Sequence, residues 1–493
     1  MLKITILLYL VGFSAGSSIL VVFPVPEKSH GVLGDILVRT LLSVGHEVTY
    51  VTPFPKEELP NLEYVAVTPV IDNSDKISLA DINKDLVMET FGTKVTQQML
   101  KHPNMQALMM NDTVHFDVIV AEWYYTGLLA PLSSVFECPL VWYTHNDVTW
   151  QSLSLVHASF PTTTADLSIK DRIYEMMSQL HLAYRNYYHF SSTEMSAYED
   201  SYKPIFESKR IFLPNYEFLV YNASFLLINS HPLFGEEWSL PPNAKYIGGY
   251  HLSERIPQLP KNLKILLDES DEGVIYVDLE TVIIKQEEHQ NIIQELIEVF
   301  SRIKQSVIVK YDEMLLNLPK NVHIMRNPPV QSILNHPNTL AFISHGGTTH
   351  FLPSIHHATP TIVIPLIKEQ ESLVQKMEKK GLAIRVDVKE LWKVNSALKM
   401  VMGNVSYKEN LNLASSLYHH RLSSPKEELC HWIQTATLRS VEFLRHSPRS
   451  SVIERYNIDI LILILLFIWF CTKFVKLFNA HLNSDEDLDK KDD

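Results

Sequence analysis

Four consecutive residues, Ser344-His345-Gly346-Gly347, have the types and the setting of a phosphate-binding turn. The apolar run Leu340–Ile343 before them predicts a buried strand, and the two glycines after its tip open the start of a helix. Backbone N–H groups at a helix N-terminus are unpaired and lie at the positive end of the helix dipole, so they can hold a phosphate. The chemistry that this turn predicts is a grip on a nucleotide diphosphate.

A second apolar run strengthens that interpretation. Thr361–Ile364 predicts another strand, which ends at Pro365 and is followed by the polar pair Glu369-Gln370. The glycine turn therefore lies between two apolar strands near the end of a long α/β chain. In that position it is a much stronger signal than His-Gly-Gly alone.

The elements that position this turn follow an alternating pattern. In the first half, strand Ile19–Phe23, loop Pro24–Gly31, helix Val32–Ser43 and strand Glu47–Thr52 form one βαβ unit. Such a unit has parallel strands and a right-handed crossover. Two further strands are predicted at Phe116–Ala121 and Leu140–Tyr143.

The second half repeats this alternation from about residue 245. Its predicted elements are helix Leu263–Asp268, strand Val274–Val277, helix Gln290–Ser301, strand Ser306–Tyr311 and a short helix near Gln331–Leu334. The fold class is therefore α/β, with two doubly wound, Rossmann-like domains. Two such domains facing each other leave a cleft at the carboxyl ends of both sheets, where ligands of open α/β sheets bind.

Length and composition agree with this organisation. At 493 residues the chain is too long for one hydrophobic core, so two domains are expected. The net charge of −13 argues against nucleic acid as a partner. The three cysteines, Cys138, Cys430 and Cys471, form neither a disulfide scaffold nor a zinc motif, so we expect no metal.

Both ends of the chain carry targeting signals. Residues 1–16 contain a lysine, the apolar run Ile4–Phe13 and small residues, as a signal peptide does. Near the other end, Ile460–Cys471 is densely apolar, and a helix over 456–478 would be long enough to span a bilayer. Lys473 and Lys476 follow the apolar run, which predicts a cytosolic tail over 479–493 and a lumenal main body.

Three glycosylation acceptors suit a lumenal body, although such triplets also arise by chance. They begin at Asn111, Asn222 and Asn404.

The whole chain resembles the membrane-bound animal UDP-glycosyltransferases, which include the UDP-glucuronosyltransferases. The residues that carry the resemblance are Pro26-Glu27-Lys28-Ser29-His30, Gly248-Gly249, Asn321-Val322, Arg326, His336-Pro337-Asn338-Thr339, His345-Gly346-Gly347, Ser354-Ile355-His356-His357, Pro360, Pro365, Gln370 and Lys490-Lys491. The resemblance implies the two-domain GT-B fold, with an acceptor domain over 17–244 and a UDP-sugar domain over 245–450. The lysine pair implies retrieval to the endoplasmic reticulum.

The reaction that the resemblance implies is the inverting transfer of glucose or glucuronic acid from a UDP-sugar to a small lipophilic acceptor. His30 occupies the position of the catalytic base, in the first β–α loop, and Glu122 occupies that of its acidic partner, where the family usually has Asp. A histidine with a pKa near 6.5 suits proton removal at neutral pH. The alternatives are a loop histidine without a role and a solvated acid.

On the donor side the chain departs from the family pattern. The uridine shelf Trp-x-Pro-Gln is replaced by Asn327-Pro328-Pro329-Val330, and a ribose-binding Glu is replaced by Pro353, which should kink or restart its helix. Glu280 replaces a glycine close to the phosphates. The residues expected to bind the donor are Ser344, His345, Gly346, Gly347, Thr348, Thr349, Glu369, Gln370, Asn327 and Val330.

Two hypotheses follow. One is an active transferase that uses a UDP-sugar as co-substrate, with no permanent cofactor. The other is a non-catalytic relative with an eroded donor site that binds apolar ligands or partner subunits. Residues 150–240 are rich in His, Tyr and Phe, which suits an apolar acceptor pocket and equally an ordinary aromatic core. Association into a homo-oligomer is compatible with the sequence.

Overall fold

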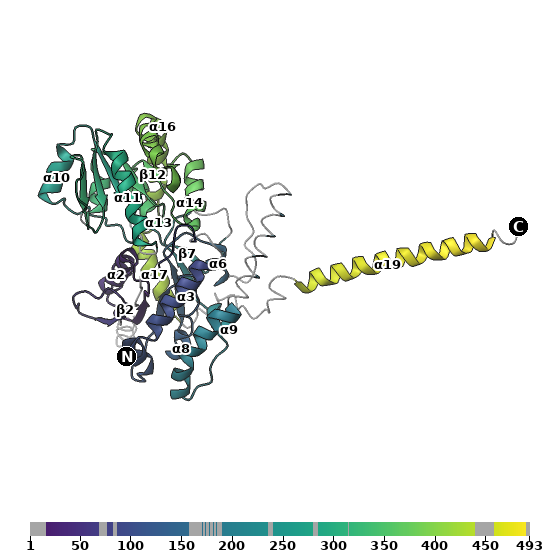
Figure 1. Ribbon diagram of the computed structural model, residues 1–493. Helices are drawn as coiled ribbons and strands as arrows, with labels where there is room; N and C mark the ends of the chain where they lie inside the picture. The colour runs from purple at the N-terminus through teal and green to yellow at the C-terminus, as the bar shows by residue number, and fades with distance from the viewer. Residues whose placement is uncertain are drawn as a thin grey trace, which may run out of the picture.

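The computed structural model describes residues 16–68, 76–81, 86–156, 190–234, 240–279, 284–313, 315–438 and 458–489, with isolated positions between 157 and 189. Its body has two lobes, each built around one parallel sheet (Figure 1). The first sheet has seven strands in the order β3-β2-β1-β4-β5-β6-β7, and the second has six in the order β10-β9-β8-β11-β12-β13. The prediction of two doubly wound α/β domains is confirmed.

The first sheet extends the predicted βαβ unit on both sides. All its neighbouring strands are parallel. Its strands are β1 (Ser18–Val22), β2 (Glu47–Thr52), β3 (Leu62–Ala66), β4 (Val118–Glu122), β5 (Leu140–Thr144), β6 (Phe225–Ile228) and β7 (Ala244–Tyr246). The sequence did not predict β3, β6 or β7, because short strands without a long apolar run give a weak pattern.

The helices of the first domain include one important correction. The loop expected over Pro24–Gly31 ends early, because α2 spans Lys28–Ser43 and Glu27 is its N-cap. Since His30, Gly31, Leu33 and Gly34 are buried, the apolar face of the helix already begins in the first turn. The other described helices are α3 (Val87–Leu100), α4 (Pro103–Met110), α5 (Leu132–Val135), α6 (Trp150–Ser154), η1 (Phe190–Glu194), α8 (Met195–Ser208) and α9 (Tyr216–Val220).

The aromatic region over 150–240 is described only in part. There, Tyr198, Tyr202, Phe206 and Tyr216 are buried within the apolar core of the first domain. The rings of Tyr198 and Tyr216 stack with centroids 4.7 Å apart. For these four residues the structure favours an ordinary aromatic core over a substrate pocket.

The second domain follows the predicted alternation closely. Its strands are β8 (Val274–Asp278), β9 (Ser306–Lys310), β10 (Val322–Met325), β11 (Thr339–Ser344), β12 (Thr361–Val363) and β13 (Ala383–Arg385). Its helices are α10 (Lys261–Asp268), α11 (Gln286–Phe300), α12 (Val330–Leu334), α13 (Thr348–His356), α14 (Lys368–Lys379), η2 (Val388–Lys393), α15 (Val394–Gly403) and α16 (Val405–His419). Pro353 was expected to kink or restart its helix, but α13 continues through it to His356.

The last helix of the body, α17 (Pro425–Ala436), returns to the first domain. Leu429, Ile433 and Ala436 share an apolar core with β1 and α2, and α17 packs against α2, β4, β5 and β6. The chain therefore crosses between the domains twice, after β7 and before α17. The expected domain boundary after residue 244 falls within β7, which belongs to the first sheet.

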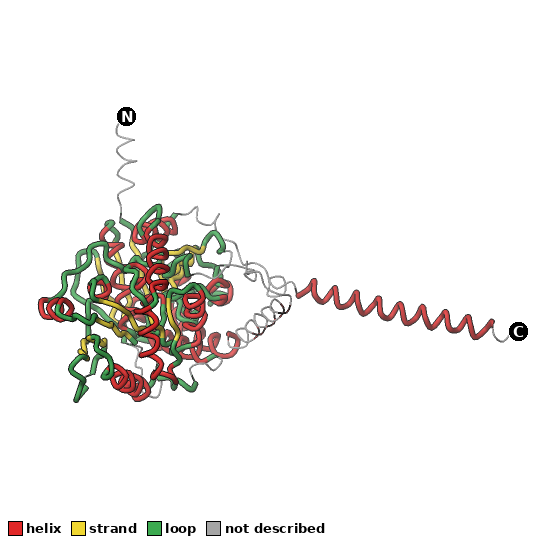
Figure 2. The backbone as a smooth tube through the Cα atoms, turned by 90° about the horizontal axis from the view of Figure 1, so that it is seen from above, coloured by secondary structure: helices red, strands yellow, loops and turns green. Residues whose placement is uncertain are grey.

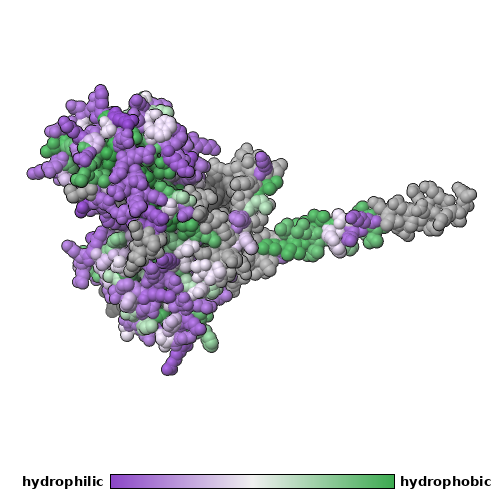
Figure 3. All heavy atoms as spheres, viewed as in Figure 1, coloured by the Kyte–Doolittle hydropathy of each residue, from purple (hydrophilic) through white to green (hydrophobic). Residues whose placement is uncertain are grey.

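A long helix, α19 (Ile458–Asp489), projects from the body (Figures 1 and 2). Its first 20 residues, Ile458–Leu477, are long and apolar enough to cross a membrane, and none of this segment is buried inside the structure. At 1.5 Å per residue they span about 30 Å, the thickness of a bilayer core. Figure 3 shows the apolar surface along this part of the helix.

Candidate active site

The first polar pair of the cleft joins α2 to β4. His30 lies in the first turn of α2, and Glu122 is the last residue of β4. Because β4 pairs directly with β1, the strand that leads into α2, both residues lie at the carboxyl edge of the first sheet. His30 Nδ1 is 2.6 Å from Glu122 Oε1, and the exposed fractions of the two residues are 4% and 1%. The structure thus brings together the residue expected to be the catalytic base and the residue expected to be its acidic partner.

The carboxylate determines both the charge and the tautomer of His30. Burial by itself lowers the pKa of His30, but the charge and hydrogen bond of Glu122, with a smaller contribution from Glu27, raise it above the usual value. An ionised carboxylate only accepts hydrogen bonds, so Nδ1 of His30 is the donor. In neutral His30 the lone pair is then on Nε2, which can accept a proton.

Sequence reasoning missed His145, which follows β5 at the same edge of the sheet. Its Nδ1 lies 3.8 Å from Glu122 Oε1, and its ring centroid is 4.2 Å from that of His30. Burial, together with the charges of His30 and His345, holds the pKa of His145 well below its usual value. The one available signal was its position, just after the strand that pairs with β4.

On the opposite side of the cleft, His345 follows β11 and pairs with Gln370 of α14. Gln370 Oε1 accepts hydrogen bonds from the backbone N–H groups of Leu366 and Ile367 at 2.9 and 3.2 Å. Its Nε2 therefore donates to His345 Nδ1, at 2.6 Å. Burial and the charge of the neighbouring His350 hold the pKa of His345 well below its usual value. His345 is thus neutral, with its proton on Nε2.

The glycine turn has the conformation that a phosphate-binding helix start requires. Gly346 has φ +90°, and a Cβ there would come within 2.5 Å of Val363 and 2.7 Å of Val374. Gly347 is the N-cap of α13. No larger residue fits at Gly346 without moving the neighbouring strand and helix, so the glycine brings the backbone of the turn close to β12.

The polar residues around the glycine turn differ in their contacts. Thr348 Oγ1 donates a hydrogen bond to the backbone carbonyl of His145 at 2.6 Å, which joins the two domains. Thr349 lines the cleft. Ser344, the last residue of β11, is fully buried, and its hydroxyl has no partner among the described residues. Because its hydroxyl is used between the domains, Thr348 can offer a ligand its backbone N–H group but not its side chain.

A polar network behind the turn was not predicted. The carboxylate of Asp278, at the end of β8, accepts hydrogen bonds from Lys310 at 3.2 Å and Tyr276 at 3.3 Å. His350 Nε2 lies 3.4 Å from the same oxygen. Burial alone would raise the pKa of Asp278, but His350 and Lys310, with a smaller effect of His345, hold it below its usual value. Asp278 is therefore ionised beneath the glycine turn.

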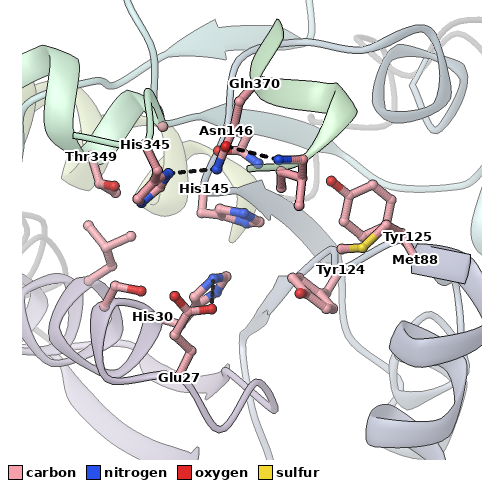
Figure 4. Close-up of a pocket in the computed structure, with 14 residues that line it drawn as sticks. Glu27, His30, Met88, Tyr124, Tyr125, His145, Asn146, His345, Thr349 and Gln370 are labelled. Carbon is pink, nitrogen blue, oxygen red and sulfur yellow. Dashed lines mark hydrogen bonds and ion pairs between the residues drawn. The ribbon is translucent and has the colours of Figure 1, made fainter. Parts of the chain in front are cut away.

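The two sets of residues face each other across one cleft (Figure 4). Its empty volume is about 520 Å³, which includes space open to solvent. Its lining residues are Glu27, Ser29, His30, Leu33, Met88, Tyr124, Tyr125, His145, Asn146, His345, Gly347, Thr349, Ile367 and Gln370. The predicted cleft between the carboxyl ends of the two sheets is thus present.

Residues 66–446 match the sequence profile of the family described as UDP-glucoronosyl and UDP-glucosyl transferase. The chain belongs to this family. UDP-glucosyltransferase 2 of Dactylopius coccus is 28% identical over 451 residues, which cover 86% of this chain and 85% of the relative. UDP-glucuronosyltransferase 2B14 of Oryctolagus cuniculus is 34% identical over 227 residues, which cover 44% of this chain and 41% of the relative. The protein is therefore a UDP-glycosyltransferase, and its relatives support the enzyme hypothesis over the non-catalytic one.

Solved structures confirm the GT-B fold of this UDP-glycosyltransferase. The calicheamicin glycosyltransferase CalG4 matches with a TM-score of 0.56 at 16% identity, over 85% of this chain and 98% of that one. A UDP-glucosyltransferase from Polygonum tinctorium matches with a TM-score of 0.55 at 15% identity, over 86% of this chain and 99% of that one.

The remaining donor residues are less well placed in this UDP-glycosyltransferase. Asn327 is exposed, whereas Val330 packs against the apolar cluster around α10 and β8. Pro353 is buried within α13. Glu280 and the side chain of Glu369 lie outside the described residues. Neither Asn327 nor Val330 lines the cleft that holds His345 and Gln370.

Proposed function

We propose that this UDP-glycosyltransferase moves glucose or glucuronic acid from a UDP-sugar to a hydroxyl group of a small lipophilic acceptor, with inversion at the anomeric carbon. The observation that carries the proposal is the buried His30–Glu122 pair, which lies in the same cleft as the His345–Gln370 pair. One pair can take a proton from an acceptor, and the other lies beside a helix N-terminus that can hold a leaving diphosphate.

In the proposed reaction, His30 is the general base. The acceptor hydroxyl gives its proton to His30 Nε2 while its oxygen forms a bond to the anomeric carbon. The bond from that carbon to the UDP oxygen breaks, and UDP leaves with the bonding electron pair. The imidazolium that forms is stabilised by Glu122 at 2.6 Å, a contact that gains strength as the charge appears.

The donor contacts are proposed as follows. The Nε2–H group of His345 and the first backbone N–H groups of α13, from Gly347 to Thr349, stabilise the negative charge on the departing diphosphate. Gln370 positions His345. Glu369 and Ser344 stay proposed donor contacts. The exposed Asn327 and the core-packed Val330 supply little, which implies weak uridine binding.

The acceptor side of the cleft suits an apolar molecule. Met88 of α3 and the rings of Tyr124 and Tyr125, which follow β4, line it beside His30 (Figure 4). Aromatic and thioether groups provide large apolar contact areas. A planar lipophilic phenol is therefore a suitable first test acceptor.

The decisive experiment incubates the purified full chain with UDP-glucose or UDP-glucuronic acid and a panel of lipophilic phenols. We expect a product whose mass increases by one hexosyl group, and a β-linkage by NMR from an α-linked donor. The same preparation carrying His30→Ala is the control for contaminating activity. If UDP binds but neither donor yields product with any phenol, the proposed transfer is wrong.

We also propose a type I topology in the endoplasmic reticulum membrane. It is supported by the apolar segment Ile458–Leu477 and the lysines that follow it. Residues 1–16 would be a cleaved signal, 17–244 and 245–450 the lumenal acceptor and donor domains, 456–478 the span and 479–493 the tail. The acceptor sites at Asn111, Asn222 and Asn404 would then be available for glycosylation.

Protease added to sealed microsomes tests this topology. We expect removal of the tail alone, which shortens the chain by only about 15 residues. Digestion of the main body without detergent would contradict it.

A further inference from the structure

Three potential metal ligands converge where β4, β5 and α2 meet. In the described part of the chain, His30, Glu122 and His145 form a group in which one ligand atom of each residue lies within 4.8 Å of the others. Nδ1 of His30 is 2.6 Å and Nδ1 of His145 is 3.8 Å from the same carboxylate oxygen. Small adjustments of the two rings and the carboxylate would place all three at ligand distance from one ion.

Two atoms of this group have unmet hydrogen-bonding capacity. Glu122 Oε2 and His145 Nδ1 are both buried and have no hydrogen-bond partner among the residues that the structure describes. Buried polar atoms in folded proteins nearly always have a partner. At 3.8 Å, Glu122 and His145 do not bond each other. A cation between them would satisfy both atoms at once.

The chemistry of the three groups suits zinc. Two imidazole nitrogens and one carboxylate form a set that binds zinc, with a water molecule in the fourth, open position. Beyond this set, Glu27 Oε2 lies 3.8 Å from Nε2, the other ring nitrogen of His30, which is beyond hydrogen-bond distance. Glu27 would therefore have to move closer to orient a metal-bound His30. His30 and His145 both line the cleft, which provides an entry path from solvent.

We propose that His30, Glu122 and His145 form a zinc-binding site, and that the bound ion inhibits sugar transfer. Zinc on Nδ1 of His30 requires that nitrogen to be deprotonated. The ring then carries its remaining proton on Nε2, so it can no longer accept one from the acceptor hydroxyl. Binding to neutral His30 moves this proton between the two nitrogens, and binding to protonated His30 releases one proton to solvent. The inhibition rests on the proposed function, but the binding does not.

The first test titrates zinc into the purified full chain by calorimetry in metal-free buffer. We expect one equivalent to bind to the wild type, and affinity to fall about tenfold or more in His145→Asn and in Glu122→Gln, because each loses a ligand. The control is His356→Asn, in a separate group of histidines where ring centroids lie 4.6 Å apart for His356–His357 and 4.5 Å apart for His356–His419. That variant should bind zinc as the wild type does.

The proposal is overturned if both site variants bind zinc as tightly as the wild type, or if His356→Asn is the variant that loses affinity. Thermal unfolding without metal shows whether each variant is folded. Should a site variant not fold, cobalt in the wild type gives the answer. Intense visible absorption from four-coordinate cobalt supports the site, whereas the weak spectrum of six-coordinate cobalt, or no binding, overturns it.

A second test measures sugar transfer in the presence of zinc. We expect zinc to inhibit the wild type, a chelator to restore the rate, and His145→Asn to be less sensitive relative to its own metal-free rate. Sugar transfer without zinc binding would contradict the zinc site and leave the proposed function supported. Zinc binding in a chain that transfers no sugar from either donor would support the zinc site and contradict the proposed function.

Discussion

The ionisable side chains on the two sides of the cleft are satisfied to different degrees. On the first domain, Glu122 and His145 each keep one buried atom that has no partner in the described part of the chain. On the second, Asp278 is bonded by Lys310 and Tyr276, and His345 is held by Gln370. Both sites lie at the carboxyl edge of a parallel sheet, so topology does not cause the difference.

This difference indicates that the first domain supplies the reacting side chain and that the second domain holds the ligand-binding backbone in place. On the first domain, the side chain of His30 would itself take part in the reaction by accepting a proton. The second domain must instead hold its hydrogen-bond donors in place for the charge of the leaving diphosphate. On the second, the paired side chains support the glycine turn, and the helix N-terminus contributes most of the binding.

The largest effect should follow from removing the base. We expect His30→Ala to lower the transfer rate by roughly 10²–10⁴-fold, as the loss of a general base typically does. UDP affinity should change little, because UDP is proposed to bind on the other domain. Steady-state kinetics and calorimetry with UDP measure the two quantities. Activity within about tenfold of the wild type would remove His30 from the role of base.

The next effect concerns pH and the carboxylate. The rate should rise with pH through the pKa of His30, because only neutral His30 accepts a proton. Since Glu122 raises that pKa, Glu122→Gln should lower it, move the rising limb of the kcat/KM profile to lower pH, and reduce the maximal rate. The control is Glu122→Asp, which keeps the charge and should keep the limb above that of Glu122→Gln. If the rising limb does not move in Glu122→Gln, a group other than His30 controls the pH dependence of the rate.

A smaller effect should come from restoring the uridine contacts. Asn327→Trp should tighten UDP binding by about 1–3 kcal/mol if its ring stacks on the base. Val330→Gln should tighten UDP binding by less than a full hydrogen bond to the uracil would. The reason is that Val330 packs against an apolar cluster, which the amide would disturb. UDP affinity by calorimetry compares the single and double variants. Tight binding by the unmodified protein, or no gain from tryptophan, would show that uridine is held elsewhere.

The smallest effect tests the contact between the two sides. Thr348→Val removes the hydroxyl that bonds the carbonyl of His145. The contact between the two domains should lose about 0.5–1.5 kcal/mol of stabilisation, and kcat/KM should fall several-fold. The matched control is Thr349→Val, whose hydroxyl contacts His350 within the second domain at 3.2 Å. We expect Thr348→Val to affect transfer more than UDP affinity. Equal effects of the two variants on transfer would remove the contact between domains as the cause.

Much of the architecture was readable from local pattern. The apolar runs predicted β1, β2, β4, β5, β8, β9, β11 and β12 to within about two residues, because a strand buried on both faces is continuously apolar. The weaker strands β3, β6, β7, β10 and β13 were missed, since three to five residues without a longer apolar run carry little periodicity. The start of α2 was placed four residues too late for a similar reason: polar Lys28 and Ser29 hid the first buried turn around His30.

The sequence by itself determined the fold class, the family and the glycine turn at Gly346-Gly347, because these depend on residues close together in the chain. Only the tertiary structure decided that His145 reaches Glu122 and that Thr348 holds the carbonyl of His145. It also decided that α17 returns to the first sheet. These contacts join segments far apart in sequence, and their formation depends on how the packed elements meet rather than on any local pattern.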